Sequence, residues 1–142
     1  YAINNEPRHL PTAVLVQDPA ERGTAIRRHR PNFYSFVPTQ LQRLLAQRDI
    51  LSMLQEAKAI ILGGAPCPQS LLQEFQKARL PVSLTYGLTE SASMVTATNP
   101  GEMVTDARMV GHCLPGREVW LVDGVVAVRG DTRFLGYVDQ EN

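Results

Sequence analysis

The chain has 142 residues, and its 14 basic and 14 acidic side chains cancel to a formal net charge of zero. With 44% apolar and 20% charged residues it has the composition of one folded globular domain, which excludes a disordered chain. The neutral balance leaves no electrostatic footprint for nucleic acid or for an anionic membrane, so neither is an expected partner. We find no signal-peptide pattern and no apolar run of membrane-spanning length in the sequence, and we therefore expect a cytoplasmic protein without membrane insertion.

The two cysteines, Cys67 and Cys113, are far apart, and His9, His29 and His112 are scattered. These spacings match neither structural zinc nor a cysteine–histidine nucleophile pair, and we expect both thiols to be reduced. The chemistry of the chain is therefore sought in its hydroxyls, carboxylates and glycine-bearing turns.

Strands and helices are predicted to alternate from residue 12 to residue 86. Apolar and β-branched runs indicate the strands, and prolines or leucine stripes mark the helices that follow them. Asp18 and Pro19, for example, are typical of a helix N-cap and a first helical position. This alternation favours an α/β fold, with a parallel sheet and covering helices. The predicted strands are 12–16, 32–37, 59–62 and 82–86, and the predicted helices are 19–28, 49–57, 68–78 and one that begins at Pro38.

The C-terminal third differs in pattern from the rest of the chain. Residues 96–108 have mixed polarity and are interpreted as a loop. Residues 118–122 and 125–129 flank Asp123-Gly124, a dipeptide typical of a tight antiparallel β-hairpin. We therefore expect two parts, an α/β subdomain over residues 1–108 and the start of a β subdomain over residues 109–142.

The most informative segment is Tyr86-Gly87-Leu88-Thr89-Glu90, at the carboxyl end of the strand predicted at 82–86. Ligands gather at the carboxyl ends of strands in open α/β sheets. There Tyr86 can stack on a base, and Gly87 lets backbone approach a ligand closely. Thr89 can donate to a phosphate oxygen, and Glu90 is a hard oxygen ligand suited to Mg²⁺. The segment therefore predicts an ATP site.

A structural interpretation of the same residues is also open, in which Thr89 or Ser91 caps a short helix and Ser93 lies at its start. A second glycine-bearing turn, Gly63-Gly64-Ala65-Pro66, follows the strand predicted at 59–62. If the two strands are parallel neighbours, both turns lie at one sheet edge and leave a slot as thick as an aromatic ring. The pair of turns favours the nucleotide site.

These segments resemble the AMP-forming acyl-CoA synthetase and adenylation superfamily. Their combination is most similar to the branch that activates o-succinylbenzoate in menaquinone biosynthesis, and the resemblance extends from about residue 12 onward. The segments that carry it are 36–41, 60–66, 86–90, 110–111, 114–119 and 136–137.

The resemblance implies a ligase reaction in two steps. A carboxylate attacks the α-phosphorus of ATP, and the thiol of CoA then displaces AMP from the acyl-adenylate. ATP, Mg²⁺ and CoA are implied, with a small carboxylic acid as the partner. By the same resemblance Thr89 and Glu90 are catalytic, Thr89 bonding the α-phosphate and Glu90 holding Mg²⁺. The implied nucleotide-binding residues are Gly63, Gly64, Ala65, Pro66, Tyr86, Gly87, Leu88 and Thr89, and Gly64 and Ser93 would border the acyl pocket.

Parts of the superfamily pattern have no counterpart in the sequence: the Ser/Thr/Gly-rich phosphate loop, the Thr-Gly-Asp segment and the C-terminal domain with its lysine. Gly130-Asp131-Thr132 has the wrong order to replace Thr-Gly-Asp. We therefore expect a central fragment of a longer enzyme, inactive in isolation. Two alternatives stay open: an adenylating ligase for a fatty or aryl acid, and a non-catalytic nucleotide-binding domain of the same fold.

Overall fold

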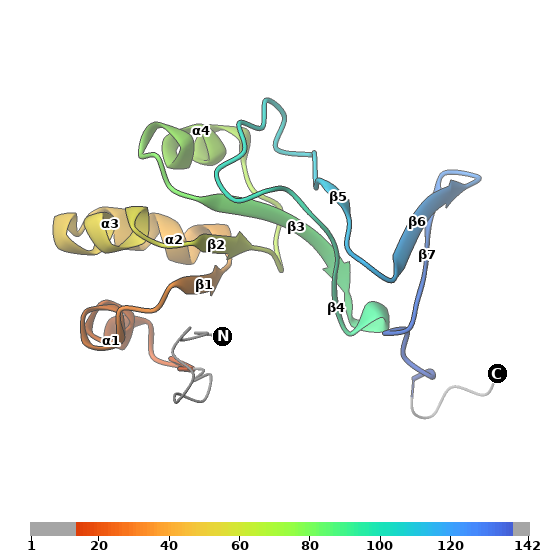
Figure 1. Cartoon of the computed structure of the whole chain (residues 1–142), viewed down its shortest axis with the longest axis horizontal. Coiled ribbons are helices and arrows are strands. Elements are labelled where there is room, and N and C mark those ends of the chain that lie inside the picture. Colours follow the sequence, from red (N-terminus) through yellow and green to blue (C-terminus); the bar gives the residue numbers. More distant parts are fainter. Residues whose placement is uncertain (1–13, 138–142) are drawn as a thin grey trace.

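The computed structural model describes residues 14–137. It contains a five-stranded sheet in the order β1-β2-β3-β4-β5 and a separate two-stranded sheet, β6-β7 (Figure 1). The helices are α1 (Arg22–His29), α2 (Pro38–Leu45), α3 (Arg48–Gln55) and α4 (Gln69–Lys77), with short 3-10 turns at Pro19–Glu21 and Thr89–Ser91. The strands are β1 (Phe33–Phe36), β2 (Ala59–Leu62), β3 (Val82–Leu88), β4 (Ser93–Ala97), β5 (His112–Cys113), β6 (Arg117–Val122) and β7 (Val125–Gly130).

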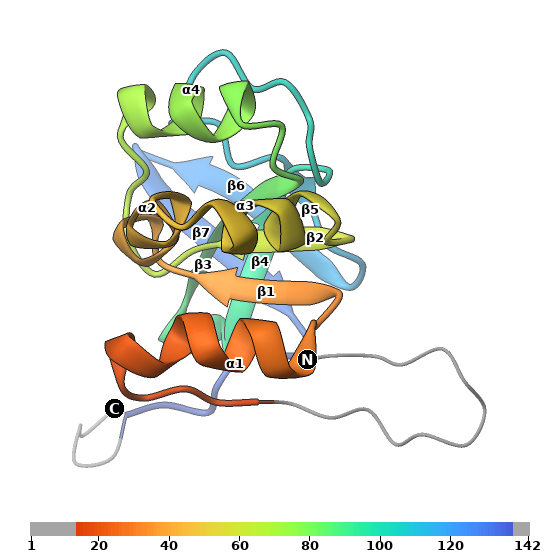
Figure 2. The ribbon, with the colours of Figure 1, turned by 90° about the vertical axis from the view of Figure 1, so that its left-hand side faces the viewer.

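The N-terminal half is the α/β layer that the sequence predicts. Strands β1, β2 and β3 are parallel neighbours. Seen from the helical side, β1 lies between α1 and the pair α2 and α3, and α4 lies at the far end of the view from α1 (Figure 2). The core between the helices and the strands is mainly aliphatic, with Tyr34 and Phe75 as aromatic members, and each buried leucine or isoleucine contributes about 1.5–3 kcal/mol of burial free energy. The largest fully buried side chains are Phe75, Leu41, Ile50, Leu54, Ile60, Leu72, Val95 and Pro38.

Helix α2 begins where the sequence predicts. Pro38 occupies the first turn, where a backbone N–H has no acceptor within the helix, so the proline loses no hydrogen bond. The Gln40 side chain accepts a hydrogen bond from the Val37 N–H at 3.2 Å. The apolar stripe then places Leu41 and Leu44 in the core, with 0% and 4% of their surfaces exposed. The other predicted helices are also confirmed, the first of them as the 3-10 turn from Pro19 that leads into α1.

The strand predicted at 12–16 is wrong for the residues that the structure describes. Thr12 and Ala13 lie outside them, and residues 14–16 have no regular structure. Leu15 is 84% exposed. A β-branched, apolar composition forms a strand only where a neighbouring strand supplies hydrogen bonds, and β1 pairs only with β2 in the described sheet.

The second half of the five-stranded sheet is antiparallel. β3 continues past the end of β2 and pairs with β4, which in turn pairs with β5. The interpretation of residues 96–108 as a loop is therefore wrong at its first two residues, which belong to β4, and correct for the remainder. The fold class is confirmed as α/β, with a mixed sheet and a separate hairpin.

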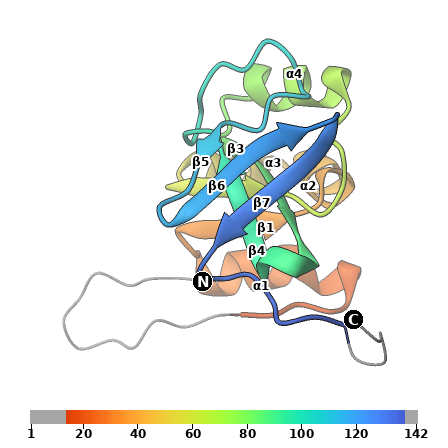
Figure 3. The same ribbon diagram turned by 90° about the vertical axis from the view of Figure 1, so that its right-hand side faces the viewer.

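The predicted hairpin is confirmed as β6 and β7. Asp123 and Gly124 have φ values of 50° and 80°, the left-handed pair that matches the twist of the flanking strands. The hairpin lies across β4 and β5 at the side away from the helices (Figure 3). Because β5 pairs with β4, the sheet itself continues past residue 108, and the division into two subdomains at this point stays a prediction. Within residues 14–137, no helix has the length and apolar character needed to cross a membrane.

Candidate functional site

The glycine turn follows β2 and lies against β3. Leu62, the last residue of β2, pairs with Leu84, so the two strands are the parallel neighbours that the sequence analysis required. The Gly63 N–H donates to the Phe36 carbonyl of β1 at 3.3 Å. A Cβ at Gly63 would lie 2.6 Å from Thr85 Oγ1, so a side chain at this point of the turn would have to displace the Thr85 hydroxyl.

The rest of this turn is open to solvent. Gly64, Ala65 and Pro66 are exposed, and Gly64 has a φ of +72°, a conformation that favours glycine. The nearest atom to a Cβ built on Gly64 is Val37 Cγ1, at 3.5 Å. The turn thus presents small residues and backbone at the carboxyl end of β2.

Tyr86 and Gly87 do not form a turn, and this prediction is wrong. Both lie inside β3, with a shift of register between them where β3 pairs with β4. A Cβ at Gly87 would lie 2.1 Å from the Ser93 carbonyl oxygen. Gly87 is therefore required by the close approach of the β4 backbone, which is the ordinary meaning of a glycine at a strand irregularity.

Thr89 and Glu90 lie on the 3-10 turn that joins β3 to β4. Ser91 is 3% exposed, and its hydroxyl is within 2.9 Å of the Leu88 carbonyl and 2.8 Å of the Ser93 carbonyl. These contacts close the turn tightly and leave the Thr89 side chain exposed.

The structural interpretation of this segment as a capped helix is wrong. Leu88 is the residue that precedes the turn; its own side chain makes no capping hydrogen bond, and its N–H donates to the Ser91 hydroxyl at 3.3 Å. Ser93 begins β4 and does not start a helix. The segment is a tight connection between antiparallel strands, with Thr89 and Glu90 at its tip.

Glu90 has a partner that the sequence analysis missed. The Tyr137 hydroxyl donates a hydrogen bond to Glu90 Oε1, and the Phe134 N–H donates to the Glu90 carbonyl at 2.9 Å. The Tyr137 hydrogen bond holds the pKa of the Glu90 carboxyl below its usual value, and the same contact raises the pKa of Tyr137. Residues 136–137 belong to the segments that carry the family resemblance, but a contact across 47 positions leaves no spacing signal in the sequence.

The site offers one carboxylate to a metal. Residues 14–137 contain no group of three or more His, Cys, Asp or Glu side chains able to hold a metal ion alone. Mg²⁺ is commonly held by one or two carboxylates, with nucleotide phosphates and water as the other ligands. Glu90 fits that mode, in which the ion arrives with the nucleotide.

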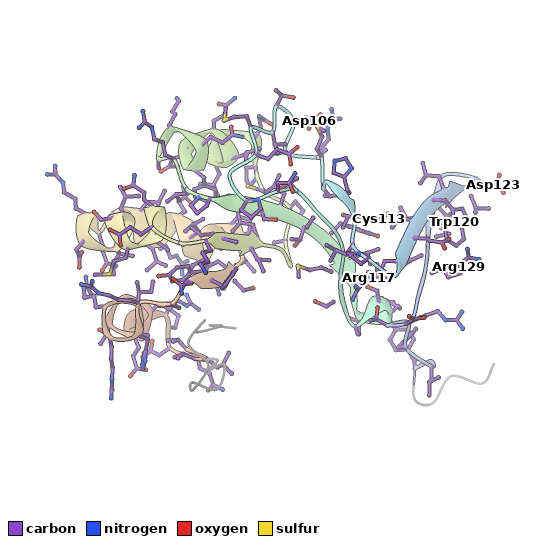
Figure 4. The ribbon with its side chains drawn as sticks, viewed as in Figure 1. Asp106, Cys113, Arg117, Trp120, Asp123 and Arg129 are labelled. Carbon is purple, nitrogen blue, oxygen red and sulfur yellow. The ribbon has the colours of Figure 1, made fainter. Side chains whose placement is uncertain are left out.

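Two cavities lie away from these residues. One, of about 280 Å³, lies at the amino end of β3 and is lined by Arg79, Pro81 and Val104 among others. The other lies on the β6–β7 face, where Arg129 pairs with Glu118 and lies 5.8 Å from the centre of the Trp120 ring (Figure 4). The residues predicted to bind nucleotide line neither cavity. Gly63, Tyr86 and Leu88 are half-buried, and the others are exposed.

The model of the AMP-binding enzyme family matches residues 9–138. The chain belongs to this family. Among curated proteins, it is 40% identical over 103 residues to 2-succinylbenzoate–CoA ligase of Escherichia coli (strain K12), covering 72% of this chain and 21% of that protein. It is 31% identical over 147 residues to the 2-succinylbenzoate–CoA ligase of Bacillus licheniformis, covering 92% of this chain and 29% of that protein. The chain thus spans less than a third of these curated relatives.

The chain is also similar in structure to solved ligases that are named for the same acid. The o-succinylbenzoate CoA synthetase of Bacillus subtilis, in complex with its acyl-adenylate intermediate, matches with a TM-score of 0.72 at 26% identity. That match covers 87% of this chain and 27% of the other. The same enzyme in complex with ATP and a magnesium ion matches with a TM-score of 0.70 at 26% identity, over 87% of this chain and 28% of the other.

Proposed function

We propose that this chain supplies the nucleotide-binding edge of an AMP-forming acid–CoA ligase whose acid is o-succinylbenzoate, in menaquinone biosynthesis. The observation that carries the proposal is the turn bearing Thr89 and Glu90, at the tip of a strand that runs beside the glycine turn after β2. The proposal is supported by the similarity of the chain to ligases named for this acid and to a related structure that holds ATP and magnesium.

The proposed reaction places charge where these residues lie. When a carboxylate attacks the α-phosphorus of ATP, negative charge builds on the phosphoryl oxygens and on the leaving pyrophosphate. Mg²⁺, when bound, neutralises part of that charge. Glu90 would hold the ion, and the exposed Thr89 hydroxyl would donate to an α-phosphate oxygen, a bond that strengthens as charge develops. The CoA thiol would then displace AMP and form the thioester.

The remaining residues would bind and orient the nucleotide. Tyr86 is half-buried inside β3, two residues before its end, and would stack on adenine, beside the backbone of the turn from Gly63 to Pro66. Gly87 and Leu88 would contribute backbone at the same edge. Gly64 and Ser93, both small and exposed, would border the acyl pocket. The small-molecule partners would be the acid, ATP and CoA, in a cytoplasmic enzyme with free thiols at Cys67 and Cys113.

ATP–pyrophosphate exchange by the protein that contains this chain tests the proposal. We expect exchange with o-succinylbenzoate in a panel that includes fatty and aryl acids. Exchange only with a fatty or aryl acid would keep the adenylation chemistry and discard the acid. No exchange with any acid, together with retained ATP binding, would favour a non-catalytic nucleotide-binding domain.

A charge-neutral substitution tests the role of the carboxylate. Glu90→Gln keeps the shape of the side chain and removes its charge, so we expect exchange to fall by about 10²-fold or more. Glu74→Gln, on the exposed face of α4, makes the same chemical change away from the turn and is expected to leave the rate unchanged.

A further inference from the structure

The chain that leaves the β6–β7 hairpin returns to the turn that carries Glu90. β7 ends at Gly130, and the Arg133 N–H donates to the Gly130 carbonyl at 3.1 Å, which turns the chain back. The next residue, Phe134, donates its N–H to the Glu90 carbonyl at 2.9 Å. Three residues further on, the Tyr137 hydroxyl reaches Glu90 Oε1. One short segment therefore holds both the backbone and the side chain of Glu90.

The two aromatic rings of this segment fix its shape. Phe134 and Tyr137 pack edge to face, with ring centres 4.8 Å apart and an angle of 80° between their planes. Gly136 between them has a φ of 152°, a backbone conformation that is essentially confined to glycine. The Tyr137 hydroxyl is thus held in place by a ring contact and by a backbone conformation that glycine allows.

The bond to Tyr137 uses only one oxygen of the carboxylate. Oε1 accepts from the phenol, which leaves Oε2 to face other partners. Carboxylates that bind metals are commonly oriented in this way by a hydrogen bond to a neighbouring residue, and loss of that bond typically weakens metal affinity or activity by 10–100-fold.

We propose that Tyr137 is a positioning residue for Glu90, orienting its second carboxylate oxygen, Oε2, toward the magnesium ion that accompanies the nucleotide. The inference rests on the proposed function, because it takes Glu90 as the metal ligand. It adds a residue from far along the chain to the site, acting through Glu90 without contact to the substrate.

Tyr137→Phe tests this inference in the full-length protein, because it removes the hydroxyl and keeps the ring that packs on Phe134. Calorimetric titration with ATP, with and without Mg²⁺, gives a readout that does not depend on turnover. We expect the affinity for ATP with Mg²⁺ to fall by about 10-fold or more, and the affinity without Mg²⁺ to stay the same. In exchange assays the Mg²⁺ concentration for half-maximal rate should rise, while the rate at saturating Mg²⁺ changes little.

The matched control is Tyr34→Phe, the same loss of a hydroxyl at a core position that is 7% exposed and lies on β1. It is expected to leave both affinities unchanged. In a Glu90→Gln background, Tyr137→Phe should have no further effect on the Mg²⁺ dependence, because the two residues act as one unit.

The outcomes separate this inference from the proposed function. If the unsubstituted protein shows no Mg²⁺-dependent ATP binding, the proposed function fails and the role of Tyr137 fails with it. If it shows such binding and Tyr137→Phe retains it in full, only the role of Tyr137 is overturned. Equal loss of ATP affinity with and without Mg²⁺, accompanied by a lower melting temperature, would make Tyr137 a structural residue and would also overturn the inference.

Discussion

The hydroxyl of Thr85 occupies the space that a side chain at Gly63 would need, since a Cβ there would lie 2.6 Å from Thr85 Oγ1. The same hydroxyl donates to the Leu62 carbonyl at 2.9 Å and ties β3 to the end of β2. The first glycine of the turn and the threonine beside it are therefore matched in size. This match fixes where the chain leaves the sheet.

Gly63→Ala should destabilise the fold, because the new methyl group displaces the Thr85 hydroxyl and breaks its bond to Leu62. We expect the free energy of unfolding to fall by about 1–3 kcal/mol in urea titration. In the double variant Gly63→Ala/Thr85→Ala the clash is relieved, so the effects of the two single substitutions should not add. Strict additivity would contradict the proposed match.

Ser91→Ala should destabilise the turn that carries the candidate site. Its hydroxyl is buried and is bonded to both strands that the turn connects, so its loss leaves the Leu88 N–H without its side-chain partner at 3.3 Å. The expected loss is about 1–3 kcal/mol of unfolding free energy. Ser70→Ala, an exposed serine on α4, is the control and should cost little.

Ala92→Gly should stabilise the chain. Ala92 has a φ of 61°, in the left-handed region that costs a residue with a Cβ about 1–2 kcal/mol. Glycine removes that cost, and we expect thermal unfolding to move to higher temperature. Ala46→Gly is the matched control. Ala46 has a φ of −65°, so the same change there relieves no strain and should lower the stability of the protein.

Asp106 should titrate well below an ordinary aspartate. The Arg108 side chain, followed by the Arg108 backbone N–H, lowers the pKa of Asp106 from 3.8 to about 2. Since the folded-state pKa is the lower one, any stabilisation from this pair is present above the ordinary pKa and is lost as the pH falls through about 2. NMR titration of the carboxyl carbon measures the value directly.

The partner substitution provides the check on this assignment. Arg108→Gln removes the guanidinium, so the pKa of Asp106 should return most of the way to 3.8, the backbone bond remaining. An unchanged pKa in that variant would show that the arginine is not the main cause.

The sequence predicted best where structure is set by neighbours in the chain. Asp123 and Gly124 adopt the positive φ values that their turn requires, and Pro38 starts its helix without a lost hydrogen bond. Strand β2 was evident because it is buried on both faces and therefore reads as an unbroken apolar run. The parallel order of β2 and β3 followed from the alternation of strands and helices.

Prediction from the sequence failed where the local structure depends on contacts with residues far along the chain. Gly87 was interpreted as a turn that admits a ligand, yet the chain that approaches it is β4. Strand β4 itself went unrecognised, because Ser93 and the residues before it are small and typical of loops. The contact of Glu90 with Tyr137 is a tertiary contact between two loops, which no local pattern encodes.

The separation of these partners along the chain bears on how the protein folds. Val122 pairs with Val125 across a two-residue turn, so β6 and β7 can meet within microseconds. Phe33 must find Ala59, and β1 and β2 therefore close a longer loop before any pairing stabilises them. Glu90 and Tyr137, 47 residues apart, can meet only after both regions are in place. We expect the hydrogen bond between Glu90 and Tyr137 to form late in folding. A partly folded chain would then already contain the turn with Glu90 and would still lack the contact that orients the carboxylate.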